Sequence, residues 1–199
     1  MGEIVLVLGG ARSGKSRQAE RLALQAGAPV IYVATATAGD EEMAERIARH
    51  RAARPPGWST VEAPYDLDVR LPGACADGNC VLIDCLSVWL SNELLQRLAG
   101  HKVDETIPVD LARACERDLS ARVQQLLAWA AQRQGTTIAV SNEVGSGLVP
   151  PYPLGRLYRD ALGTANQAVA ARASAVYLVV AGIAVDLRRL AAASADEES

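Results

Sequence analysis

Eight consecutive residues near the start of the chain have the spacing of a phosphate-binding loop. Gly9-Gly10-Ala11-Arg12-Ser13-Gly14-Lys15-Ser16 matches the pattern G-x-x-x-x-G-K-[ST] at every defined position. The glycines let the backbone wrap closely around a phosphate, so that successive N–H groups point at it from the N-terminus of a helix. We therefore expect Lys15 to reach the β- and γ-phosphates of a nucleoside triphosphate, and the Ser16 hydroxyl to ligate Mg²⁺.

A glycine-rich turn can match this pattern by chance, and the flanking residues decide between the two interpretations. The apolar run Ile4–Leu8 precedes the loop, and the amphipathic segment Lys15–Ala26 follows it, as a strand–loop–helix unit requires. In proteins with such a loop, a carboxylate that helps to hold Mg²⁺ should follow directly after another buried strand. Asp84, directly after Val81–Ile83, has that position.

A second candidate site lies in the segment Asp40–Arg54, where His50 stands among arginines. Helical spacing puts four residues on one stripe: Met43, Ile47, His50 and Arg54. Four arginines surround the histidine in sequence: Arg46, Arg49, Arg51 and Arg54. One interpretation is a packed helix with a partly buried histidine. The other is a neutral imidazole, kept uncharged by neighbouring cations, that attacks an α-phosphorus and carries a nucleotide covalently.

Short apolar runs that lack polar alternation predict strands buried on both faces. They are Ile4–Leu8, Val30–Ala34, Val81–Ile83, Thr137–Val140 and Val176–Val180, with a weaker candidate at Ser59–Glu62.

Helical segments separate these strands. Lys15–Ala26 should end at Gly27, Asp40 should cap a helix that Pro55-Pro56 ends, and an apolar stripe from Leu111 to Leu127 predicts a long helix ending near Gly135. The alternation predicts an α/β fold: a single P-loop domain, residues 1–190, with a mainly parallel sheet flanked by helices. The acidic end at 191–199 is expected to be a disordered tail.

Composition narrows the class of protein. The formal net charge of -3 argues against a nucleic-acid partner, which requires a basic face. The chain has no C-x-x-C pair among its four cysteines, which are Cys75, Cys80, Cys85 and Cys115, and it has only two histidines. We therefore expect no zinc site. No apolar stretch is long enough for a membrane span, and Ile4–Leu8 is too short for a signal peptide. We expect a cytoplasmic protein with reduced cysteines.

Three functions remain compatible with these residues. A signalling GTPase or other regulatory nucleotide switch should carry N-K-x-D, and Ser141-Asn142-Glu143-Val144 lacks its Lys and Asp. A plain small-molecule or nucleotide kinase would use the phosphate loop and leave His50 as a packing residue. A nucleotidyltransferase would use both.

The pattern of motifs resembles one family over nearly the whole chain, from the first strand to about Leu187. It is similar to the bifunctional adenosylcobinamide kinase/adenosylcobinamide-phosphate guanylyltransferases of the cobalamin pathway. The resemblance rests on Gly9–Arg17, Ala34-Thr35-Ala36, the segment Asp40–Arg54 with H-R-A-A-R-P from His50, Trp58, Glu62, Ser141–Gly145 and the closing strand through Gly182. The chain departs from the family at Asp84, where many members carry glutamate.

The resemblance implies a role for each matching residue. His50 would receive GMP, and Lys15 would act in phosphoryl transfer. The nucleotide site would comprise Gly9, Gly10, Ala11, Arg12, Ser13, Gly14, Lys15, Ser16, Ala34, Thr35, Ala36, Arg51, Ala52, Ala53, Arg54, Glu62 and Asp84. Ser16 and Asp84 would hold Mg²⁺.

By the same resemblance, the enzyme would phosphorylate the corrinoid adenosylcobinamide with ATP or GTP. It would then transfer GMP from GTP through a histidine–GMP intermediate to adenosylcobinamide phosphate, giving adenosyl-GDP-cobinamide. A homotrimer is implied by the resemblance alone.

Overall fold

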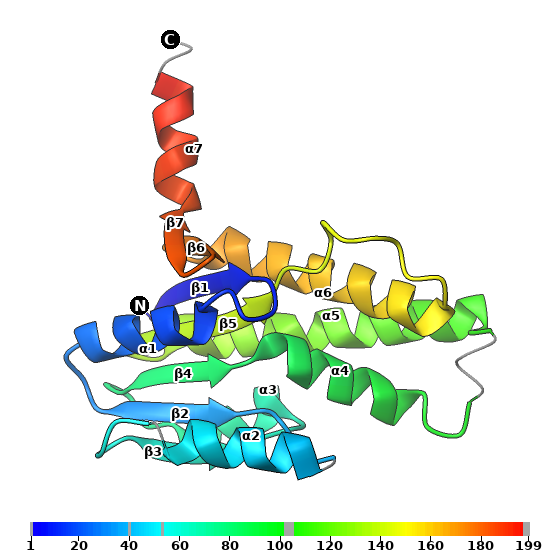
Figure 1. The fold of residues 1–199 in the computed structure, drawn as a ribbon, viewed down its shortest axis with the longest axis horizontal. Helices are drawn as coiled ribbons and strands as arrows, with labels where there is room; N and C mark the ends of the chain where they lie inside the picture. Colours follow the sequence, from blue (N-terminus) through cyan, green and yellow to red (C-terminus); the bar gives the residue numbers. More distant parts are fainter. Residues whose placement is uncertain (1, 40, 53, 102–105, 197–199) are drawn as a thin grey trace.

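Strands and helices alternate along the chain around one central sheet (Figure 1). The computed structural model describes residues 2–39, 41–52, 54–101 and 106–196, and for residues 42, 43, 46 and 194–196 the backbone only. Its strands are β1 (Glu3–Gly9), β2 (Val30–Ala34), β3 (Ser59–Glu62), β4 (Cys80–Asp84), β5 (Thr136–Asn142), β6 (Ala175–Val180) and β7 (Ile183–Asp186). Its helices are α1 (Lys15–Gln25), α2 (Glu41–Ala52), α3 (Leu67–Ala74), α4 (Leu86–Arg97), α5 (Val109–Gln132), α6 (Pro153–Arg172) and α7 (Leu187–Asp196).

Within the described residues the sheet has seven strands in the order β3-β2-β4-β5-β1-β6-β7. Neighbouring strands run parallel, except that β6 and β7 pair antiparallel. The expected α/β fold with a mainly parallel sheet is therefore confirmed. Every strand predicted above is present, including the weaker Ser59–Glu62. The antiparallel strand β7 was not predicted, because it is short and carries the exposed side chains Ile183 and Val185.

Alternate residues of the buried strands supply two separate cores. Ile31, Val33, Val81 and Ile83 face the helices α3 to α6, whereas Val5, Val7, Tyr32 and Leu82 face α1. This division follows from the two-residue period of a strand, which sends successive side chains to opposite faces. Each strand is apolar on both faces because helices cover both faces of the sheet.

The predicted helices begin and end close to their expected positions. Helix α1 runs to Gln25 with Ala26 at its C-terminus, and α5 ends at Gln132, just before Gly135. Helix α2 ends at Ala52, ahead of Pro55, and the proposed cap Asp40 lies outside the described residues. No helix in the described ranges has both the length and the apolar composition needed to cross a bilayer.

The C-terminal segment differs from its expected state. Residues from Ala191 were expected to be disordered, yet α7 continues as a helix to Asp196 and projects away from the sheet (Figure 1). Alanine is the strongest helix former, and Ala191–Ala193 extend a helix that starts on Leu187, so propensity outweighs the lack of packing here.

Candidate functional site

The loop between β1 and α1 adopts the conformation that its glycines permit. Gly14 has φ +95°, a left-handed conformation that few side chains tolerate, and it forms the N-cap of α1 without any side-chain cap. A Cβ at Gly9 would lie 2.4 Å from Ser13 Oγ and 2.7 Å from the Val179 carbonyl oxygen. The uncapped first-turn N–H groups of α1 are thus available to an anion, as a phosphate-binding loop requires.

Neighbouring segments hold this loop in place through backbone hydrogen bonds. The Gly182 N–H, in the turn between β6 and β7, donates to the Ser13 carbonyl at 2.8 Å. The Glu143 N–H, just after β5, donates to the Gly9 carbonyl at 3.2 Å. Lys15 Nζ donates to the Gly10 carbonyl at 3.1 Å, so the lysine lies across the mouth of the loop.

Several predicted residues lie in one row at the carboxyl ends of the strands. Ala34 is in register with Glu62 on one side and with Asp84 on the other. Gly9 is in register with Asn142 at the end of β5. Ligands of open parallel sheets bind at this edge. The fold therefore brings the phosphate loop, Ala34, Glu62 and Asp84 to the same edge of the sheet.

Thr35 ties the ends of β2 and β4 together. Its buried hydroxyl accepts a hydrogen bond from the Cys85 N–H at 2.8 Å and donates to the Cys85 carbonyl at 2.9 Å. Asn92 Nδ2, on α4, donates to the Thr35 carbonyl at 2.9 Å. These bonds fix the backbone that carries Asp84. Ala36, which follows Thr35, is partly buried beside it.

His50, on α2, lies against the face of the sheet that α1 also covers. Its Nδ1 is 3.3 Å from the Tyr32 hydroxyl, and that hydroxyl donates to Asp84 Oδ2 at 3.0 Å. Burial, reinforced by the neighbouring Asp84 carboxylate, raises the pKa of the Tyr32 hydroxyl, so it keeps its proton. The histidine, Asp84 and the strand ends thus form one polar cluster.

The arginines around His50 have different environments. The Arg54 guanidinium stacks 3.7 Å from the centroid of the Tyr32 ring and donates to Thr60 Oγ1 at 2.8 Å. Arg51 lies 3.6 Å from Glu62, with both side chains exposed, and Arg49 and Ala52 are also exposed. The side chain of Arg46 and the whole of Ala53 lie outside the described residues. Arg54 therefore joins the polar cluster of His50, Tyr32 and Asp84 by its contact with the Tyr32 ring.

Two polar residues of this cluster were missed by the sequence analysis. Tyr32 stands in a strand that is otherwise apolar, and a buried tyrosine hydroxyl nearly always has a polar partner, which is the signal that could have found it. Glu20 lies on the α1 face toward His50, Asp84 and Arg54. Burial raises its pKa, His50 and Arg54 oppose that rise, and Asp84 adds to it.

The donor atoms suit Mg²⁺ held mainly by a nucleotide. Ser16, in the first turn of α1, offers a hydroxyl, and Asp84, at the end of β4, offers a carboxylate. Mg²⁺ in such enzymes uses one or two carboxylates plus phosphates and water. Within the described residues, the buried Ser13 Oγ and Asn142 Oδ1 beside this loop have no hydrogen-bond partner, as expected of atoms that meet a ligand. No cluster of three or more His, Cys, Asp or Glu side chains in the same ranges fits a metal ion.

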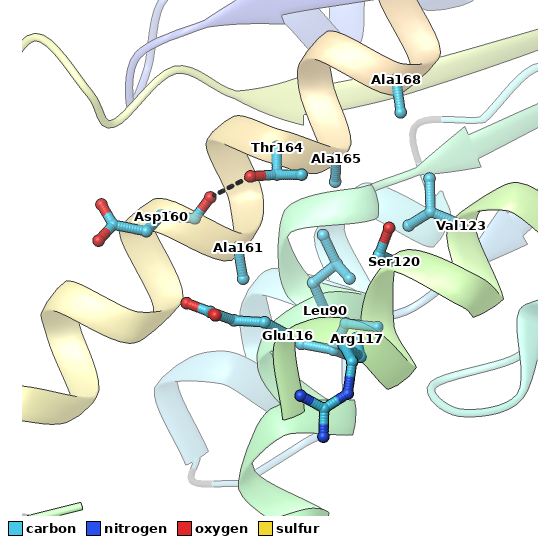
Figure 2. Close-up of a pocket in the computed structure, with 11 residues that line it drawn as sticks. Leu90, Glu116, Arg117, Ser120, Val123, Asp160, Ala161, Thr164, Ala165 and Ala168 are labelled. Atoms are coloured by element: carbon cyan, nitrogen blue, oxygen red, sulfur yellow. Dashed lines mark hydrogen bonds between the residues drawn. The ribbon is translucent and has the colours of Figure 1, made fainter. Parts of the chain in front are cut away.

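A separate cavity lies between α4, α5 and α6 (Figure 2). It encloses about 440 Å³, and apolar side chains such as Leu90, Val123 and Ala165 line it, with Glu116 and Asp160 among its charged residues. None of the residues that line it belongs to the phosphate loop or to the His50 cluster, so it is distinct from the candidate site.

A phosphate-binding loop between the first strand and helix of a parallel sheet, with a carboxylate ending a nearby strand, defines a P-loop nucleotide-binding protein. The model of the family described as "Cobinamide kinase / cobinamide phosphate guanyltransferase" matches residues 5–187. The chain belongs to this family.

Curated relatives match this chain over nearly their full length. The "Bifunctional adenosylcobalamin biosynthesis protein CobP" of Pseudomonas aeruginosa is 44% identical over 187 residues, covering 92% of this chain and 96% of that protein. The proteins named "CobU" with the same description are 39% identical in Escherichia coli and 41% identical in Salmonella typhimurium, each over 93% of this chain and 99% of the relative. The chain is thus a bifunctional cobalamin-biosynthesis enzyme of this family.

Among solved structures, the chain is similar to the RadB recombinase. The TM-score is 0.46 at 18% identity, and the match covers 89% of this chain and 74% of that chain.

Proposed function

We propose that the enzyme phosphorylates adenosylcobinamide and then transfers GMP from GTP to adenosylcobinamide phosphate through a histidine–GMP intermediate on His50. The observation that carries this proposal is the position of His50. Its ring contacts Tyr32, which bonds Asp84, at the same sheet edge as the phosphate loop. The family name, which includes both a kinase and a guanyltransferase, supports it.

In the kinase step, the N–H groups of the loop and Lys15 would hold the β- and γ-phosphates of ATP or GTP. The corrinoid hydroxyl attacks the γ-phosphorus, its bond to phosphorus forms, the bond from phosphorus to the nucleoside diphosphate breaks, and the hydroxyl proton is released to solvent. Such transition states are loose, so positioning and charge neutralisation supply most of the rate. Mg²⁺ near Ser16 and Asp84 would neutralise charge on the phosphate oxygens.

In the transferase step, a ring nitrogen of His50 attacks the α-phosphorus of GTP. A P–N bond forms, the P–O bond to pyrophosphate breaks, and GMP remains on the histidine. The phosphate of adenosylcobinamide phosphate then attacks the same phosphorus and frees the histidine. Both substrates are anions at that point, which fits the nearby positive charges of Lys15 and Arg54.

Intact-protein mass spectrometry tests this mechanism. After incubation with GTP and Mg²⁺, the protein should gain the mass of one GMP, lose it in acid and keep it in alkali, because protonation turns imidazole into a good leaving group. His50→Ala should form no adduct. His101→Ala removes the other histidine, which is exposed shortly after α4, and should form the adduct normally. An acid-stable adduct, or one that persists in His50→Ala, would place the nucleophile elsewhere, and a plain kinase would retain no GMP at all.

The partners that we propose are the corrinoid and a nucleoside triphosphate. We also propose a homotrimer in the cytoplasm, by resemblance to the family. Sedimentation equilibrium of the purified enzyme measures the oligomeric state directly, and a monomer would refute the trimer.

A further inference from the structure

One hydroxyl connects the histidine to the carboxylate. The Tyr32 hydroxyl has a single proton, which it donates to Asp84 Oδ2 at 3.0 Å. Its oxygen can then only accept a hydrogen bond from His50 Nδ1, which lies 3.3 Å away. The proton of the neutral ring must therefore sit on Nδ1, and the lone pair must sit on Nε2.

The tyrosine ring is held firmly enough to set this arrangement. Tyr32 is 3% exposed in the middle of β2, and it is in register with Leu82, two residues before Asp84 on the neighbouring strand. The Arg54 guanidinium covers the ring at 3.7 Å, and the Trp58 ring stacks with its centroid 6.5 Å away. The hydroxyl therefore has little freedom to turn away from Asp84 and His50.

We propose that Tyr32, oriented by Asp84, is a positioning residue that fixes His50 as the Nδ1–H tautomer and so makes Nε2 the atom that attacks phosphorus. This inference rests on the proposed function and deepens it. An imidazole that is not constrained prefers its proton on Nε2, and in that form Nε2 has no lone pair for attack. The arrangement has the logic of a serine-protease triad, in which a carboxylate sets the tautomer of the histidine.

The same contacts accommodate the charge that the reaction creates. When the Nε2 lone pair forms the P–N bond and pyrophosphate leaves, the ring retains its Nδ1 proton and becomes a cation. The Nδ1–H bond to the Tyr32 oxygen strengthens, and the Asp84 carboxylate offsets the new charge through the tyrosine hydroxyl. When the corrinoid phosphate displaces the nitrogen, the ring returns to the neutral Nδ1–H form, so no proton need leave the cluster during the cycle.

Nitrogen-15 NMR of the histidine ring tests the tautomer without any substrate. The chain has only two histidines, so a spectrum of His101→Asn assigns the signals of His50. At about pH 9, above the range in which histidines ordinarily titrate, wild-type His50 should show a protonated Nδ1 and an unprotonated Nε2. Tyr32→Phe should shift the ring toward the Nε2–H form. A wild-type ring protonated on Nε2 would overturn the inference whether or not the variant folds.

Kinetics of adduct formation provide the second readout. Tyr32→Phe keeps the ring that contacts Arg54 and Trp58 and removes only the hydroxyl. The rate of GMP transfer to His50 should fall about 10- to 100-fold, as for other partners that orient a histidine, whereas γ-phosphoryl transfer should be retained. Tyr158→Phe is the matched control, because its partly buried hydroxyl donates to the Ser87 carbonyl in α4, on the opposite face of the sheet from Tyr32, and this variant should react at the wild-type rate.

The two proposals fail in different ways. If wild-type enzyme forms no acid-labile GMP adduct on His50, the proposed function is wrong. If the adduct forms normally in wild type but Tyr32→Phe matches it in rate and tautomer, the proposed function stands and the role of Tyr32 is refuted.

Discussion

Lys15 is the residue whose positive charge we expect to contribute most to phosphoryl transfer. It lies across the phosphate loop, and its charge also acts on Cys85, next to Asp84. Lys15→Ala should reduce γ-phosphoryl transfer about 10²- to 10³-fold with the fold intact, as expected when one preorganised donor to a transition state is removed. Arg21→Ala changes an exposed cation on the same helix and should leave turnover unchanged. Near-normal kinase turnover of Lys15→Ala would show that the loop is not catalytic.

Glu20 should make stability depend on pH. Burial raises its pKa in the folded state above the value of 4.5 for a free side chain. The folded protein then holds this proton more tightly than the unfolded chain does, so the stabilisation is complete below pH 4.5 and is lost as pH rises through the higher folded value. Glu20→Gln, which is neutral at every pH, should therefore become more stable than wild type as the pH rises from 4.5 to 8.

Urea unfolding without metal or nucleotide, at several values of pH, measures this difference. Glu116→Gln is the matched control, because it makes the same change in an exposed glutamate on α5. A Glu20→Gln variant that loses stability relative to wild type as pH rises would reverse the sign and contradict the burial argument.

Residue type and spacing predicted Gly9–Ser16, Asp84 and His50 as candidates. The loop and Asp84 follow recognisable strands, and His50 stands among arginines in a helical segment. Tyr32 could not be predicted in the same way. Its importance arises from a contact between β2 and α2, 18 residues apart, and from the register of β2 with β4. Neither the packing of two elements nor the register of two strands can be predicted from a run of apolar residues.

At the scale of elements, a buried ionic network joins α3, α4 and α5. Glu93 on α4 is fully buried and accepts hydrogen bonds from Trp89 Nε1 at 3.0 Å and from Arg122 Nη1 at 2.9 Å. It also accepts from the Asp66 N–H at 2.7 Å, just before α3, and from Arg97 Nη1 at 2.6 Å. Arg122 in turn pairs with Asp66 and Asp68. These helices are thus connected behind the sheet, away from the loop.

Removing Glu93 should destabilise the fold strongly. Glu93→Ala leaves two arginines and the Trp89 indole N–H without their shared partner, and breaking a buried ion pair costs about 3–5 kcal/mol of unfolding free energy. Urea denaturation measures this loss. Gln96→Ala, on the exposed side of α4, should change stability by less than about 0.5 kcal/mol. A Glu93→Ala variant within about 1 kcal/mol of wild type would mean that the network contributes little.

Strands were the elements best predicted from sequence, because a short apolar run between turn residues is specific when helices cover both faces of the sheet. The hairpin of β6 and β7 shows where this reasoning ends. Its turn supports the phosphate loop through Gly182, yet β7 has no buried apolar run to reveal it. The turn supports the loop by donating a backbone hydrogen bond from Gly182 to the Ser13 carbonyl, and such a bond depends on the position of the backbone and not on side-chain type.

At the scale of the whole molecule, the order of the strands decides where the site lies. Strand β5 lies between β1, which carries the phosphate loop, and β4, which carries Asp84. The sequence predicts that the strands are parallel but not their order, because each is apolar on both faces and can pair with several neighbours. The edge that collects the loop, Asp84 and His50 therefore follows from the complete fold.

The C-terminal helix stands outside this arrangement, and its outer part should be dispensable. Leu187 packs against the core, and Arg188 donates to the Ala170 carbonyl. Beyond them, Ala192 and Ala193 are exposed on a helix that projects away from the sheet (Figure 1). Among the described side chains, deleting residues 192–199 removes none that belongs to the core, so the midpoint of thermal unfolding should change by less than about 2 °C. GMP should still be transferred to His50 at the wild-type rate.

A longer deletion, of residues 187–199, is the matched comparison. It removes the buried part of Leu187 and the contact of Arg188, which is expected to cost about 1–2 kcal/mol and to lower the midpoint by about 4 °C or more. Differential scanning calorimetry of both truncated proteins separates the two parts of α7. If the shorter deletion already lowered the midpoint as far as the longer one, the outer turns would be making contacts that stabilise the molecule, and α7 would have to be regarded as part of the folded domain along its whole length.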